Sequence, residues 1–124
     1  MNRINLLLVL GVGLLCLYGC RSAADIYQRR ISLTLLEPTR PAKPADGVKV
    51  YEYKNAVTED YDVVALMKAE GYPTEVAKFK KAFQQRAADI GADGLIFKQV
   101  NLDEGLGVRI SDVAAVRGEA IVFR

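Results

Sequence analysis

Residues 74–90 constrain the fold most, because their apolar side chains fall on one side of a helix. The apolar positions are three or four residues apart, which places them in one stripe, while charged residues fall elsewhere. This stripe consists of Val76, Phe79, Phe83, Ala87 and Ile90. Thr74 can cap the start of the helix and Gly91 ends it. A helix with one apolar side needs an apolar surface to cover, such as one face of a sheet.

Runs of strand-forming residues flank this helix on both sides. They alternate apolar and polar positions or are continuously apolar, and turn residues separate them. The runs are 48–53, 61–67, 95–100, 108–110 and 113–123. Gly118 interrupts the last run and predicts a bulge or a bend. The sequence therefore predicts an α/β (α+β) domain over 47–124, in which the helix packs on a small mixed sheet of four to five strands.

Composition limits both size and chemistry. The chain has 124 residues, 51% of them hydrophobic, which is typical of one small domain. It has no His, and its two Cys lie at positions 16 and 20. The part after Cys20 therefore has no disulfide, no thiolate or imidazole metal site, and no Cys or His catalysis. A formal net charge of only +2 argues against a nucleic-acid partner.

The N-terminus has the order of a secretory signal peptide. A short basic start, 1–5, precedes an apolar run over 6–18, and the polar mature chain follows. The run is too short for a membrane-spanning helix, which needs about 20 residues. We therefore predict a signal peptide over 1–19.

The end of this run resembles the bacterial lipobox. Leu17, Tyr18, Gly19 and Cys20 stand in its order, and Tyr18 is bulkier than the usual residue at its position. The resemblance implies cleavage between Gly19 and Cys20, a diacylated Cys20 thiol and an acylated new amine. The alternative is an ordinary signal peptide with a chance cysteine, such as Cys16.

Residues 20–46 are predicted to connect the lipidated cysteine to the domain. They contain a Pro-rich stretch, 37–44, and an alternating run over 31–36 that favours a strand. Two alternatives stay open: a docked strand leaves a short tether, and an undocked one leaves a tether nearly three times as long.

In Gram-negative lipoproteins, an Asp after the lipidated cysteine retains the protein at the inner membrane. Arg21 stands here, so the resemblance implies the periplasmic face of the outer membrane.

A second resemblance concerns most of the domain, about 49–123. The segments that carry it are 61–64, 80–83 with 87–88, 91–96 and 118–122. They resemble small envelope and cytoplasmic domains grouped as heavy-metal-binding proteins, and the sensor lipoprotein of the Rcs envelope-stress phosphorelay. This resemblance implies an α/β fold, and a sensor or metal-binding role. The domain itself has no Cys or His for such metal binding, and the chain cannot form the sensor's disulfides.

The acidic residues offer little catalytic chemistry. Asp93, between Gly91 and Gly94, is expected to have a structural role at the turn from helix to strand by bonding local backbone amides. Glu59, Asp60 and Asp62 lack the spacing of a calcium loop, and 105–107 lacks the features of a phosphate-binding loop. A carboxylate pair for acid–base catalysis would have to come from Asp93, Asp103, Glu104 and Asp112. We therefore predict no enzyme, no catalytic or metal site and no cofactor.

Two surface features remain for binding. One is a set of basic residues with two alternative roles, contact with anionic headgroups or simple solvation: Arg29, Arg30, Arg40, Lys43, Lys78, Lys80, Lys81 and Arg86. The tyrosines Tyr51, Tyr53, Tyr61 and Tyr72 are expected to pack half-buried on the sheet rather than line an interface.

The sequence thus favours a lipid-anchored envelope protein that binds, assembles or senses. Its expected partners are membrane lipid through Cys20, another envelope protein or further copies of itself. The alternatives are a periplasmic small-molecule or ion-binding module and, less favoured, a small hydrolytic enzyme.

Overall fold

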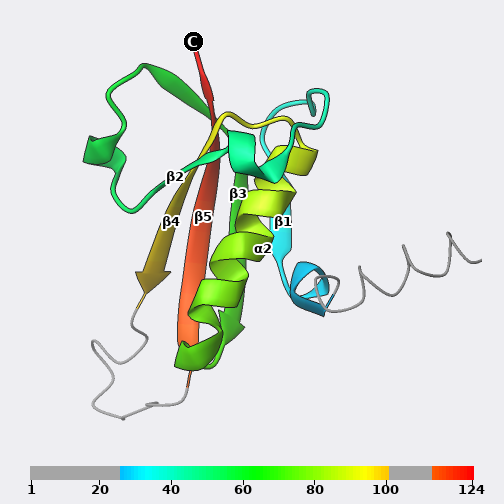
Figure 1. Ribbon diagram of the computed structural model, residues 1–124, viewed down its shortest axis with the longest axis vertical. Coiled ribbons are helices and arrows are strands. Elements are labelled where there is room, and N and C mark those ends of the chain that lie inside the picture. The colour runs from blue at the N-terminus through cyan, green and yellow to red at the C-terminus, as the bar shows by residue number, and fades with distance from the viewer. Residues whose placement is uncertain (1–25, 101–112) are drawn as a thin grey trace, which may run out of the picture.

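The structure is a five-stranded sheet with one long helix on one face (Figure 1). It is a computed structural model, and it describes residues 26–100 and 113–124. The sheet has the order β1-β3-β5-β4-β2. Its strands are β1 (Ser32–Leu35), β2 (Lys49–Tyr51), β3 (Tyr61–Gly71), β4 (Gly94–Val100) and β5 (Ala114–Phe123). The predicted α/β fold with a mixed sheet is therefore confirmed.

The sheet is mixed because its edge strand β2 runs parallel to β4, whereas every other pair is antiparallel. The central strands β3 and β5 are the longest, with 11 and 10 residues. The expected strands over 48–53 and 61–67 are found with altered ends, because β2 stops at Tyr51 and β3 continues to Gly71. The expected strand over 108–110 lies outside the described residues.

The helix α2 (Val76–Asp89) begins two residues later than the sequence predicts. Pro73–Glu75 forms a 3-10 turn instead, so the prediction that Thr74 caps the helix is wrong. The start is organised by Glu75, whose carboxylate accepts a hydrogen bond from the backbone N–H of Tyr72 at 3.0 Å. A carboxylate at this position also suits the positive end of the helix dipole.

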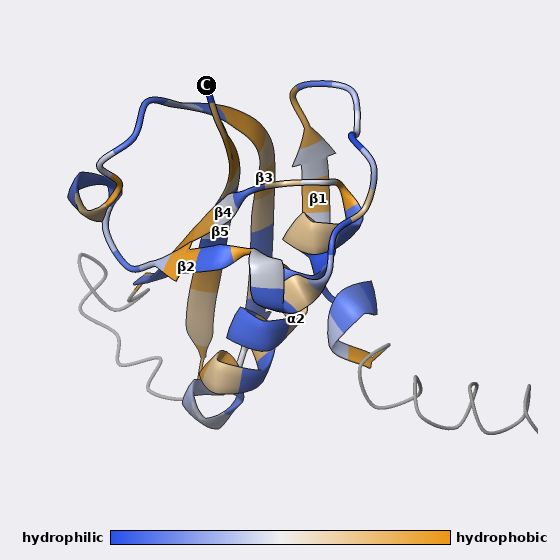
Figure 2. Ribbon diagram, turned by 45° about the horizontal axis from the view of Figure 1, so that its top comes forward, coloured by the Kyte–Doolittle hydropathy of each residue, from blue (hydrophilic) through white to orange (hydrophobic). Residues whose placement is uncertain are grey.

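The predicted apolar stripe is the inner face of α2. Phe79, Phe83, Ala87 and Ile90 are buried, and Val76 packs partly buried against them. Figure 2 shows hydrophilic residues on the side of α2 that faces away from the sheet. Edge-to-face contacts between aromatic rings extend the stripe to Tyr27 on one side and to Phe97 of β4 on the other. Such contacts stabilise a pair of rings in addition to the effect of burying their apolar area. The centroid distances are 5.2 Å for Tyr27–Phe79, 6.4 Å for Phe79–Phe83 and 5.3 Å for Phe83–Phe97.

Gly118 does not form the predicted bulge. It pairs in register with Met67 on one side and Phe97 on the other. A Cβ on Gly118 would lie 2.7 Å from Cδ2 of Phe83 and 3.0 Å from Cδ1 of Leu95. This glycine therefore provides room for the Phe83 ring on the central strand, and its conformation is ordinary.

The irregularity of the sheet lies in β3, where the register with β5 shifts between Val63 and Ala65. The carbonyl of Val64 accepts hydrogen bonds from the N–H groups of Leu36 and Glu37, at 2.9 and 3.3 Å. The bulge therefore fixes the point at which the chain leaves β1.

Residues 26–35 are part of the fold. Residues 26–29 are helical, and Tyr27 packs on Phe79. The side-chain amide of Gln28 donates a hydrogen bond to the carbonyl of Ala82 at 2.7 Å. β1 then pairs with β3, so the strand expected over 31–36 is docked. Of the two alternatives for this run, the docked strand is the one found.

The Pro-rich stretch 37–44, which the sequence analysis placed in the tether, lies between β1 and β2 and passes the end of α2. The N–H groups of Arg40 and Lys43 donate to the carbonyls of Ile90 and Ala88, at 3.0 and 2.9 Å. Carbonyls at a helix end lack partners within the helix, and this stretch supplies them. Gly91 ends the helix with φ of 78°, as predicted, and a Cβ there would also lie 2.7 Å from Cβ of Arg40. No helix among the described residues has the length and apolarity needed to cross a membrane.

We expect Gly118→Ala to lower the free energy of unfolding by about 1–3 kcal/mol, because the added methyl group must displace the buried Phe83 ring. Urea denaturation followed by circular dichroism measures this change. Gly47→Ala is the control, since nothing lies within 4 Å of its Cβ position. Equal stability of the two variants would contradict this account of Gly118.

Candidate functional site

The junction between α2 and β4 is held by Asp93. Its carboxylate accepts a hydrogen bond from the backbone N–H of Phe123 at 3.0 Å and forms an ion pair with Lys43. Burial acts to raise the pKa of Asp93, but the Lys43 ammonium and the Phe123 N–H outweigh it and hold this pKa below its ordinary value. The amide partner lies 30 residues away, whereas the sequence suggested a local one. Asp93 lies in the turn between Gly91 and Gly94, and its bond to Phe123 therefore connects this turn to the end of β5.

The other acidic candidates do not converge in the described part of the chain. Asp62 pairs with Arg124 at 2.7 Å, and the hydrogen bond from this guanidinium lowers the pKa of Asp62. The carbonyl of Asp60 accepts from the Arg124 N–H, and Glu59 is exposed. No group of three or more potential metal ligands occurs among residues 26–100 and 113–124. Asp103, Glu104, Asp112 and the 105–107 turn lie outside the described residues.

Arg30 is engaged within the fold. Its guanidinium lies 2.8 Å from the Glu75 carboxylate, donates to the carbonyl of Glu70 at 2.9 Å, and stacks 4.9 Å from the centroid of the Phe79 ring. The hydrogen bond from Arg30 is the main reason that the pKa of Glu75 falls to about 2. A second contribution comes from the N–H of Tyr72. Arg30 therefore fastens residues 26–30 to the start of α2.

The remaining basic candidates are spread over the surface. Lys43 pairs with Asp93, Lys80 lies 3.9 Å from Glu52, and the Lys78 ammonium lies 5.8 Å from the Tyr27 ring centroid. In the part of the chain that the structure describes, no ion pair involves Arg29, Arg40, Lys81 or Arg86.

The tyrosines divide into two kinds. Tyr51 and Tyr61 are half-buried, as expected. Tyr53 and Tyr72 are 69% and 63% exposed, so the expectation of half-burial is wrong for these two. Both follow the end of their strand, where the side chain no longer has a neighbouring strand to pack on.

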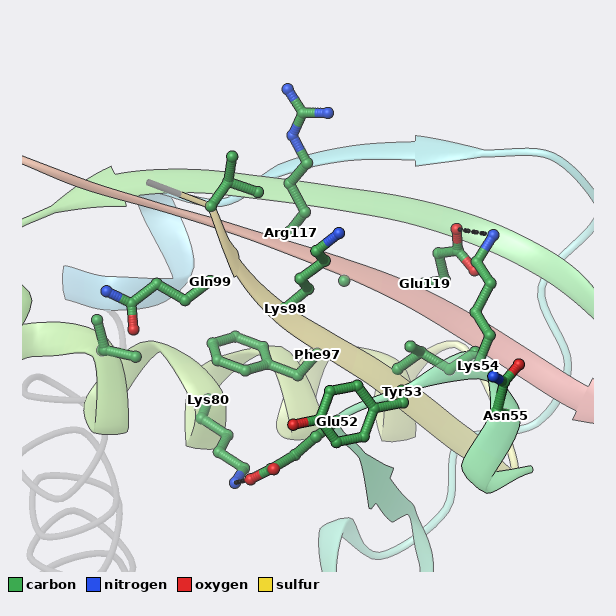
Figure 3. Close-up of a pocket in the computed structure, with 14 residues that line it drawn as sticks. Glu52, Tyr53, Lys54, Asn55, Lys80, Phe97, Lys98, Gln99, Arg117 and Glu119 are labelled. Carbon is green, nitrogen blue, oxygen red and sulfur yellow. Dashed lines mark ion pairs between the residues drawn. The ribbon is translucent and has the colours of Figure 1, made fainter. Parts of the chain in front are cut away.

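An open groove of about 830 Å³ runs along β4 (Figure 3). β2 pairs with β4 only as far as Ile96, so the rest of β4 has a described neighbour only on the β5 side. Residues 52–55 form one wall, and Lys80 of α2 lies on another. An ion pair of 3.3 Å between Lys54 and Glu119 closes one end. The sequence did not indicate this groove, because it depends on where β2 stops.

Comparison with known proteins yields one structural likeness. No protein-family model matches the chain, and no curated protein matches it. The fold is similar to a solved structure, the Francisella virulence factor FvfA in its orthorhombic form. The TM-score is 0.54 and the identity 16%, over 73% of this chain and 94% of FvfA. At this identity the likeness concerns the fold alone.

Stability should fall in acid through Glu75. Its pKa in the folded chain is about 2, against an ordinary value of 4.5, so its stabilising effect is complete above pH 4.5 and disappears as the pH falls toward 2. We expect Glu75→Gln to lose less stability than the wild type across this window in thermal melts. Glu59→Gln should keep the wild-type slope, since Glu59 has no ion pair in the described residues. An unchanged slope in Glu75→Gln would refute the assignment.

Asp93→Ala should lower the free energy of unfolding by about 1–3 kcal/mol, because the Phe123 N–H and the Lys43 ammonium lose their acceptor. The matched control is Asp89→Ala. Asp89 is exposed and, among the described residues, bonds only Gln85 of its own helix, so a change of at most about 0.5 kcal/mol is expected. Urea titration of both variants gives the comparison, and similar small effects would argue against a structural role for Asp93.

Proposed function

We propose that this chain is a lipid-anchored protein of the cell envelope whose α/β domain acts by binding, assembly or sensing at the membrane surface, without catalysis. The lipobox-like residues Leu17, Tyr18, Gly19 and Cys20 support the anchor. The observation that carries the proposal is the position of this motif relative to the fold. Residues 26–30 already pack on α2, and only 21–25 separate them from Cys20.

This spacing determines how the domain is held. Six residue steps lead from Cys20 to Ile26, which span at most about 20 Å when fully extended. Each buried methylene of an acyl chain contributes about 0.8 kcal/mol, and several chains on one cysteine give lasting attachment. A domain held so closely stays next to the bilayer and meets partners there. Because Arg21 follows Cys20, the proposed destination is the periplasmic face of the outer membrane.

The proposed partner, besides membrane lipid, is another envelope protein. Further copies of this chain are also compatible with the anchor, provided that all the tethers lie on the same side of the assembly. The exposed Tyr53 and Tyr72 support a protein contact, because tyrosine is enriched at interfaces. Nucleic acid is not proposed as a partner.

The groove along β4 favours a second candidate, a small-molecule or ion-binding module. A pocket of several hundred Å³ with a few polar groups is the usual form of a ligand site. The two functions differ in their readout. A ligand-binding module melts at a higher temperature when its ligand is present, whereas an assembly module co-purifies with envelope proteins and shows no such shift.

Metabolic labelling with a palmitate analogue tests the anchor. We expect the wild type to incorporate the label and to sediment with membranes, and Cys20→Ala to lose the label. The matched control is Cys16→Ala, which removes the other cysteine of the same apolar run and should keep the label.

A pull-down from detergent-solubilised envelopes, with the labelled wild type as bait, then identifies the partner. Wild-type protein that stays unlabelled and fractionates with soluble proteins would overturn the anchor. Label that persists in Cys20→Ala and disappears in Cys16→Ala would show that Cys16 is the lipidated residue, which would overturn the proposed anchor.

A further inference from the structure

Three basic residues form a row across the face of the sheet that α2 does not cover. Lys68 of β3 lies directly opposite Arg117 of β5, and Arg117 lies directly opposite Lys98 of β4. All three are exposed, and successive side chains of a strand alternate between the faces of the sheet. Their neighbours in sequence, such as Met67 and Phe97, belong to the core under α2. In Figure 3, Lys98 and Arg117 extend from adjacent strands on the side away from α2.

Among the described residues, the cations of this row repel one another. Like charges directly opposite each other on antiparallel strands destabilise a sheet, and here one cation has such a neighbour on both sides. Within the described residues, the five ion pairs engage other cations. The nearest acid on the same face of β5, Glu119, is paired with Lys54. Glu70 of β3 shares the face, and the row still has an excess of positive charge.

The surroundings of the row suit a flat, anionic surface. A shallow recess of about 470 Å³ lies beside it, lined by Ser32, Lys68 and Arg117 among others. Leu66, two residues from Lys68 on the same face, is 43% exposed. Arginine can bind a phosphate group through two parallel hydrogen bonds, and lysine adds a compact charge. Cations next to exposed apolar side chains are the combination that contacts a lipid headgroup region.

The row also lies at the end of the sheet from which the chain runs toward Cys20. Lys68 pairs with Ser32, the first residue of β1, so the row ends beside the strand that directly follows residues 26–30. Figure 1 shows the start of β1, the end of β4 and the start of β5 at the same end of the sheet. With the proposed anchor, the short connection between Cys20 and residues 26–30 keeps this end near the bilayer.

We propose that Lys68, Arg117 and Lys98 bind phosphate groups of phospholipids in the membrane that carries the anchor, and so orient the domain on it. This inference rests on the proposed lipid anchor. The occupant is a phospholipid surface because the positive charge, the exposed Leu66 and the small number of residues that separate Cys20 from the fold all fit a bilayer at this end.

Vesicle co-sedimentation tests the proposal. The chain from residue 20 on, with Cys20→Ser, is mixed with vesicles of phosphatidylcholine, with or without phosphatidylglycerol. We expect binding only to the phosphatidylglycerol vesicles, and binding that weakens as salt is added. Each Lys or Arg near an anionic surface contributes about fivefold to binding, so Lys68→Gln, Arg117→Gln and Lys98→Gln together should reduce it about 100-fold.

A second triple variant controls for net charge. Lys49→Gln, Lys81→Gln and Arg86→Gln remove the same charges from other parts of the surface and should reduce binding far less. The row variant should melt at an equal or higher temperature than the wild type, because the repulsion between its cations is removed. Equal loss in both triple variants, or no loss in the row variant, would overturn the proposal.

Two further measurements distinguish binding to a bilayer from binding to other anionic ligands. Inorganic phosphate that saturably raises the melting temperature of the wild type, but not of the row variant, would assign the row to free phosphate and overturn the membrane proposal. An envelope protein captured only by the wild-type row, without vesicle binding, would also overturn it. The anchor is tested by label at Cys20, which does not depend on the row, so either proposal can fail alone.

Discussion

The contact between Phe83 and the middle of the sheet is the constraint on which the fold depends. The ring lies over Gly118 of β5, the central strand, and meets Phe97 of β4 edge-to-face. A Cβ at position 118 would lie 2.7 Å from Cδ2 of this ring, so any larger residue there would displace the ring. Through Phe79, the same row of rings reaches Tyr27, so the contact that places α2 also places the first described segment of the chain. Helix, sheet and N-terminal segment therefore share one apolar core.

Local patterns predicted the elements well because the relevant forces act over a few residues. The stripe from Val76 to Ile90 predicted the buried face of α2, and Gly91 predicted its end. The role of Gly118 and the path of residues 37–44 depend on long-range contacts, which local patterns do not predict. Gly118 was interpreted as a bulge because a glycine in a strand has several uses, and only the position of Phe83 distinguishes them. Likewise, prolines over 37–44 indicate extended backbone, but not that this backbone bonds the end of α2.

The candidate sites show the same division. That Asp93 belongs to the turn could be read from its two neighbouring glycines, whereas its bond to Phe123 depends on the register of β5. The row of Lys68, Arg117 and Lys98 had no signal in the sequence, because its members are 19 to 49 positions apart and meet only through strand pairing. The order of the strands, not any single motif, brings these three cations together.

The docking of residues 26–30 has a mechanical consequence. A force applied from the side of Cys20 reaches the fold first at the Tyr27–Phe79 contact, the Gln28–Ala82 hydrogen bond and the Arg30–Glu75 ion pair. These contacts must give way before tension reaches the β1–β3 ladder, whose bonds would then be loaded along the strand. The ion pair is the exposed member of this set, and it weakens with salt and acid. Under tension from the proposed anchor, residues 26–30 would therefore detach from α2 before β1 is pulled from the sheet.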